Sequence, residues 1–305
     1  MAWLHFVVWG PVYMGIGLAL AWWGIRGRKN GLPGGRLSVV TFATGLLLLI
    51  VGIGLRLISG PFSLRLDIPT EFWEWYRDYR FIVPLLLGIL AMSVLALPVR
   101  ARTGRGTANL APRTPLSFTN KWWLITPGLV LSLIVTLTIA AGMASEPDAR
   151  TGRYTMYFVD TGGGRSMGTG IYGWFSSLPS LILLGIMMVV AAIALFLIAR
   201  PALNDDQEQD AHTRIIRTSN VLMVGTGALL WHLGLIFGSL AATASLRGNF
   251  STSQGNVRSW TTFAALEPTL NIASIVAPAL GFALWGAVTL SAIPSRRRAL
   301  VAGRP

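Results

Sequence analysis

Long apolar stretches constrain this chain more than any other feature of its sequence. A helix needs about 20 residues to cross the roughly 30 Å hydrocarbon core of a bilayer. Seven stretches are long enough, at approximately residues 2–25, 36–58, 80–98, 122–144, 172–199, 219–246 and 261–291. The sequence therefore predicts an all-α polytopic membrane protein with seven transmembrane helices, which form a single transmembrane domain over residues 1–305.

The composition agrees with a membrane protein and argues against other classes. Hydrophobic residues make up 53% of the chain and charged residues only 12%, whereas soluble proteins carry about 25% charged residues. The net charge of +13 does not indicate a nucleic-acid partner, because the basic residues sit in short loops rather than on one water-facing surface. The chain has no cysteine, which excludes disulfides, thiolate zinc sites and iron–sulfur clusters.

The positions of lysine and arginine predict the orientation of the helices. Cytoplasmic loops retain basic residues, and 16 of the 25 basic residues fall on one side of the predicted topology. We therefore expect a multi-pass protein of a bacterial inner membrane, with the N-terminus outside and the C-terminus in the cytoplasm. The residues assigned to the cytoplasmic side are Arg26, Arg28, Lys29, Arg36, Arg100, Arg102, Arg105, Arg113, Lys121, Arg200, Arg214, Arg217, Arg296, Arg297, Arg298 and Arg304.

Two predicted outer loops contain patterns typical of regular structure. The loop at residues 59–80 has aromatic residues at spacing i, i+3, i+4 and i+7, which predicts a short interfacial helix that acts either as an anchor or as a lid. These aromatic residues are Phe72, Trp75, Tyr76 and Tyr79. The loop at residues 145–171 has an extended-type segment at 154–159 followed by three glycines, which predicts a Gly-rich hairpin.

Ionisable residues inside apolar stretches are the candidate ligand-binding residues, because they are costly to bury in a bilayer. At 1.5 Å per residue, His232 is expected near the midplane and Glu267 about 9 Å below the outer boundary. If the helices adjoin, they form an outward-facing pocket that is closed towards the cytoplasm. Its predicted members are His5, Arg56, Trp231, His232, Glu267 and Asn271. Closer to the cytoplasm we expect only Ser, Thr and Asn220, and the acidic run at 204–210 is interpreted as a solvated linker.

These residues also have structural interpretations. Glu267 and Arg56 would pair to lower the cost of two charges, and His232 would bond to a backbone carbonyl or a hydroxyl. Gly234 and Gly238 form a GxxxG pattern, which allows close approach of helix backbones. Either another helix of the same chain or a partner subunit packs there, and the aromatic outer helix is a second candidate partner surface.

The sequence favours a non-enzymatic function. The first hypothesis is an integral membrane subunit of a larger transport or cell-envelope complex, which binds other membrane-protein subunits. The alternative is a stand-alone permease, or a protein that binds a lipid or small solute in the outward-facing pocket. A haem-binding redox protein is the third, since His232 and Met14 match in depth. An enzyme has little support, because the only catalytic pair, Glu267 with His232, differs in depth by about two turns. We expect no metal and no cofactor.

Overall fold

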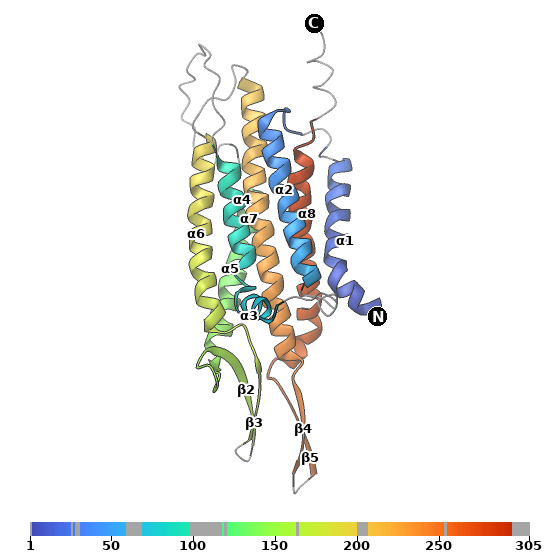
Figure 1. Ribbon diagram of the computed structural model, residues 1–305, viewed down its shortest axis with the longest axis vertical. Helices are drawn as coiled ribbons and strands as arrows, with labels where there is room; N and C mark the ends of the chain where they lie inside the picture. Colours follow the sequence, from blue (N-terminus) through green and yellow to red (C-terminus); the bar gives the residue numbers. More distant parts are fainter. Residues whose placement is uncertain are drawn as a thin grey trace.

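The computed structural model is a bundle of long, roughly parallel helices with two β-hairpins that project from one end (Figure 1). We call this end the hairpin end and the other the far end. Helix α1 begins near the hairpin end, and α8 finishes at the far end. The structure describes residues 2–25, 27, 31–58, 69–97, 118, 121–162, 165–199, 207–252 and 255–294.

The long helices follow the predicted apolar stretches closely, except at the start of α7 and of α8. Their bounds are Ala2–Ile25 for α1, Arg36–Ile58 for α2, Val83–Ala96 for α4, Trp122–Met143 for α5, Trp174–Ala199 for α6, Gln207–Ala244 for α7 and Glu267–Ser291 for α8. A 3-10 turn, Ala264–Leu266, precedes α8. The structure is therefore consistent with the predicted helical membrane class.

The number of crossings is only partly determined. Within the described residues, five helices are long and apolar enough to span a membrane, namely α2, α5, α6, α7 and α8. Helix α4 has 14 residues and is therefore about 21 Å long, shorter than a hydrocarbon core of about 30 Å. Together with α3 (Thr70–Tyr79) it counts as a sixth, broken span with a bend of 76°. Seven crossings thus stay a prediction.

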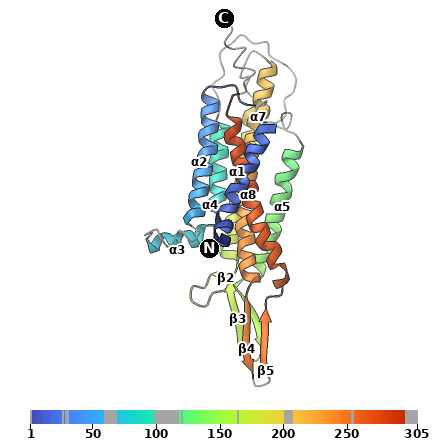
Figure 2. The same cartoon turned by 90° about the vertical axis from the view of Figure 1, so that its right-hand side faces the viewer.

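Helix α3 confirms the short helix expected in the loop at 59–80. It projects sideways from the bundle at the hairpin end (Figure 2), and none of its residues is buried. The rings of Phe72 and Tyr76 stack at 6.2 Å, while Trp75 and Tyr79 are exposed. The aromatic face therefore does not contribute to the core of the bundle.

Two antiparallel hairpins extend the hairpin end. The first joins β2 (Tyr154–Gly162) to β3 (Arg165–Gly170), with β1 (Glu146–Pro147) on the other side of β2, so the hairpin predicted at 145–171 is confirmed. The second joins β4 (Arg247–Thr252) to β5 (Gly255–Trp260) and was not expected from the sequence. The hydroxyls of Tyr157 and Thr262 lie 3.1 Å apart and connect the two regions.

The core is centred on the antiparallel pair α7 and α8. Helices α4, α5 and α6 pack against α7, whereas α1 and α2 pack against α8. Between the two central helices, Trp285 is fully buried against Trp231 and Phe282. The indole N–H of Trp285 donates to the carbonyl of Val224 at 3.2 Å, which satisfies the only donor of that side chain.

Helix α7 begins twelve residues earlier than the predicted stretch at 219–246, which corrects two expectations. Part of the acidic run at 204–210 is helical, and Asp210 is buried in an ion pair with Arg214 at 2.9 Å. Arg214 is fully buried and donates to the last carbonyls of α6, those of Ile198 and Ala199, both at 2.7 Å. The half of the bundle near the far end therefore contains charged groups, not only Ser, Thr and Asn.

A second arginine of α7 donates hydrogen bonds to the last carbonyls of α4. Arg217 is buried and donates to the carbonyls of Leu97 at 3.0 Å and Leu95 at 3.3 Å. The last carbonyls of a helix have no partner within the helix, and cations are favourable there. Two residues that were assigned to a cytoplasmic loop thus cap the ends of two neighbouring helices inside the bundle.

Candidate functional site

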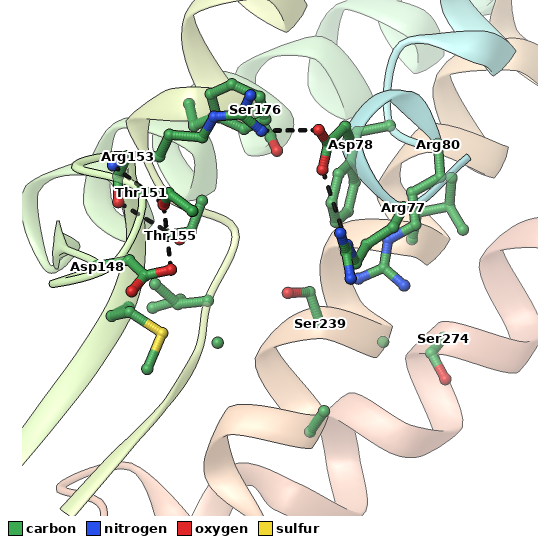
Figure 3. Close-up of a pocket in the computed structure, with 18 of the residues that line it drawn as sticks. Arg77, Asp78, Arg80, Asp148, Thr151, Arg153, Thr155, Ser176, Ser239 and Ser274 are labelled. Atoms are coloured by element: carbon green, nitrogen blue, oxygen red, sulfur yellow. Dashed lines mark hydrogen bonds and ion pairs between the residues drawn. The ribbon is translucent and has the colours of Figure 1, made fainter. Parts of the chain in front are cut away.

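A cavity of about 540 Å³ lies at the hairpin end of the bundle (Figure 3). Its walls come from the last turn of α2, from α3 and its bend into α4, from the β1–β2 turn and the start of α6. Helix α7 contributes Gly234 to Ala242 along one side, and α8 contributes Ser274. Segments far apart in the sequence therefore meet around a single space.

The charge of the cavity is its main feature. Among its described lining residues are five arginines and two aspartates, which leaves an excess of three positive charges. The arginines are Arg56, Arg77, Arg80, Arg150 and Arg153, and the aspartates are Asp78 and Asp148. Walls of low dielectric constant focus the field of charges of one sign, so the cavity attracts anions.

Both aspartates are engaged with groups of the protein. Figure 3 shows Asp78 between two arginines: it pairs with Arg153 at 2.7 Å and with Arg77 at 3.8 Å. Asp148 accepts from the backbone N–H of Arg150 at 2.9 Å and from the hydroxyl of Thr151 at 3.1 Å. The backbone N–H of Arg150 and the Thr151 hydroxyl hold the pKa of Asp148 below its usual value, so it stays ionised at neutral pH.

The two arginines nearest the helices are less well satisfied. Arg56 belongs to the last turn of α2, and Arg80 lies at the bend between α3 and α4. Both are partly buried, and within the described part of the chain the Nε of each has no hydrogen-bond partner. The Arg80 guanidinium lies over the ring of Phe81, 4.8 Å from its centre. Buried polar atoms normally have a hydrogen-bond partner, so both guanidinium groups are incompletely satisfied within the described part of the chain.

His232 supports the cavity without lining it. Its side chain is fully buried, and Nδ1–H donates to the carbonyl of Phe81 at 2.7 Å. The Tyr172 hydroxyl lies 3.5 Å from Nε2, and the rings of Tyr172 and Phe81 are in contact at 4.6 Å. His232 thus holds together the starts of α4 and α6, as in the structural interpretation of this residue. His232 therefore lies at the level where α4 and α6 begin, at the hairpin end of the bundle.

We expect His232→Leu to lower the free energy of unfolding by about 1–2 kcal/mol, because the Phe81 carbonyl then loses its buried donor. Thermal unfolding in detergent would measure this change. His232→Asn keeps an N–H donor near the position of Nδ1 and should recover part of the loss. A leucine variant as stable as the wild type would contradict the role of His232 in this contact.

The remaining predicted pocket residues do not gather with Arg56. Glu267 is the first residue of α8 and pairs with Arg247 at 3.0 Å, not with Arg56. Asn271 is exposed on the surface of α8. Trp231 packs within the core, 5.4 Å from Trp285. The side chain of His5 lies outside the described residues. The predicted polar pocket from His5 to His232 is therefore replaced by the arginine-lined cavity.

The two glycines of the GxxxG pattern have different surroundings. Gly234 is buried, and a Cβ placed there would overlap the ring of Pro278 on α8. At Gly238 the nearest atom to such a Cβ is the Cβ of Ser274, 3.9 Å away. Both glycines line the cavity. Gly234 thus packs within the chain, while Gly238 leaves space beside the cavity.

Most of the charged lining was missed at the sequence level, although one signal was present. Nine basic residues fall on the side of the predicted topology that should carry few, and five of these line the cavity. Of these five, only Arg56 was assigned to a pocket, because sequence alone does not show that separate loops meet.

The cavity has to be interpreted from its own chemistry. Comparison with protein-family models, with curated proteins and with solved structures finds no match. Arginine presents a planar fork of donors and is weakly hydrated, so it is suited to binding oxyanions in partly buried sites. Several arginines from three segments that line one space therefore indicate a site for an anionic group.

Proposed function

We propose that this protein binds an anionic solute or an anionic lipid headgroup in a cavity that opens to the outside of the cell. The observation that carries the proposal is the excess of arginine over aspartate in the cavity, with two arginine Nε atoms lacking a partner among the described residues. Either a stand-alone binding protein or a permease would use such a site.

The orientation is part of this proposal. We infer seven crossings of a bacterial inner membrane, with the hairpin end outside and the far end in the cytoplasm. The concentration of basic residues in the loops at the far end supports this orientation. The position of α3 near the helix ends, with its aromatic residues exposed, supports an interfacial location.

Binding fits the lining better than catalysis does. The described lining residues include no histidine, cysteine or glutamate, which are common acid–base or nucleophilic groups. Both aspartates are hydrogen-bonded to neighbouring groups. The cavity offers fixed positive charges and hydroxyl groups, which hold a ligand without transforming it.

A subunit of a larger membrane complex is the second candidate, and the two projecting hairpins favour it (Figure 2). They extend beyond the helices and expose Tyr154 and Trp260, which are residue types enriched in protein interfaces. The two functions are compatible, because among the described lining residues the first hairpin contributes only Thr155, Met156 and Gly170, and the second hairpin contributes none.

Anion binding can be tested with the full chain in phosphatidylcholine nanodiscs. We expect malonate, sulfate or inorganic phosphate to raise the melting temperature. Arg80→Gln should weaken this binding about tenfold or more, equivalent to 1.4 kcal/mol. Arg258→Gln removes the same charge from an exposed residue of β5 outside the cavity and should leave binding unchanged. If none of the anions binds, or if both variants lose binding equally, the proposal fails.

A further inference from the structure

The five arginines of the cavity are not equivalent, and their differences point to the class of the ligand. Arg153 is paired with Asp78 and lies over the ring of Phe175, 4.4 Å from its centre. Arg77 shares the same aspartate, and its side chain is 67% exposed. These two arginines therefore form the rim of the cavity and are already partly neutralised.

Arg56 and Arg80 form a distinct pair deeper in the cavity. They come from different elements, the last turn of α2 and the bend after α3, and both line the same cavity. Both side chains are partly buried, and in the described part of the chain each has an Nε without an acceptor. Two guanidinium groups from separate elements thus line one space.

We propose that Arg56 and Arg80 together bind a single phosphate group of the ligand, an inference that rests on the proposed anion-binding function. A carboxylate has two oxygens and is satisfied by one guanidinium fork. A tetrahedral phosphate offers three or more acceptor oxygens in different directions and takes forks from two sides. A pair of partly buried arginines from separate elements therefore matches phosphate better than carboxylate.

Two sources of phosphate fit this position. Arg56 lies in the last turn of a candidate membrane span, at the level where the headgroup of an outer-leaflet phospholipid would be found. A phosphorylated solute from outside the cell presents the same chemistry. The subsite recognises the group that both share.

Calorimetric titration of the full chain in micelles of a maltoside detergent, which contains no phosphate, tests the subsite. We expect inorganic phosphate to bind about tenfold more tightly than acetate, which has a single carboxylate. Arg56→Lys and Arg80→Lys retain the charge but remove the fork, so each should weaken phosphate binding about tenfold while affecting acetate much less. Arg258→Lys is the matched control and should change neither titration.

The outcomes separate this inference from the broader function. Equal binding of phosphate and acetate, with both unchanged by the lysine variants, would overturn the phosphate subsite and leave anion binding intact. Absence of binding for every anion would overturn both. Where phosphate binds as expected, nanodiscs that contain phosphatidylglycerol identify the source: loss of the phosphate signal by competition indicates a lipid headgroup, and an unchanged signal indicates a soluble phosphorylated ligand. Either result supports the subsite.

Discussion

Replacing Arg214 with leucine is expected to lower the free energy of unfolding by about 3–5 kcal/mol, the usual cost of breaking a buried ion pair from one side. Asp210, which is only 5% exposed, would lose its ion pair with Arg214. The carbonyls of Ile198 and Ala199 would also lose their donor. The loss therefore combines a broken buried ion pair with the loss of a donor to two helix-end carbonyls.

Unfolding by SDS titration, followed by tryptophan fluorescence, would measure this change. Arg258→Leu removes an exposed arginine and should alter stability by less than about 0.5 kcal/mol. The double variant Asp210→Leu/Arg214→Leu removes both charges and should be more stable than Arg214→Leu alone. An Arg214→Leu protein with the stability of the control would show that this pair does not hold α6 to α7.

The variants Gly234→Ala and Gly238→Ala are expected to change stability in opposite directions. A Cβ at Gly234 overlaps Pro278, whose ring is fixed to the backbone of α8, so the helices must separate. Overpacking of this kind costs about 1–3 kcal/mol. At Gly238 the nearest atom is 3.9 Å away, and alanine should stabilise α7 by up to about 1 kcal/mol through its higher helix propensity.

Melting temperatures of the two glycine variants in one detergent would test this contrast, since each change adds the same methyl group to the same helix. Loss of stability at both positions would mean that Gly238 also lies in a tight helix contact. Unchanged melting temperatures for both variants would mean that α7 and α8 do not pack closely at Gly234. Release of a co-purified subunit by Gly238→Ala would instead favour the complex-subunit function.

Helix positions were largely predictable because a helix that crosses lipid needs an apolar stretch of sufficient length. The first five predicted stretches match the observed helices within three residues. The start of α7 was not predictable in this way. Asp210 and Arg214 neutralise each other across one helical turn and become buried, which hydropathy alone reports as a polar loop. Strands β4 and β5, of six residues each, have no alternation of apolar and polar residues.

The candidate site was harder to predict than the fold. Arg56 was identified because it interrupts an apolar stretch, and it does line the cavity. Glu267 was assigned to the same site, but the hairpin between α7 and α8 brings Arg247 to it instead. Sequence gives the depth of a residue along its own helix but not which helices are neighbours. Close contacts such as that of Gly234 with Pro278 determine which helices are neighbours.

The length of α7 links the two ends of the molecule. Its 38 residues form a rod of about 57 Å, longer than the 40–45 Å thickness of a bilayer with its headgroups. It contains no proline, so it lacks the commonest cause of a sharp kink. One continuous helix therefore connects Gly238 and Ser239 in the cavity wall with Arg214 and Arg217 near the far end. A displacement of α7 at the cavity would also move these two arginines and the helix ends that they cap.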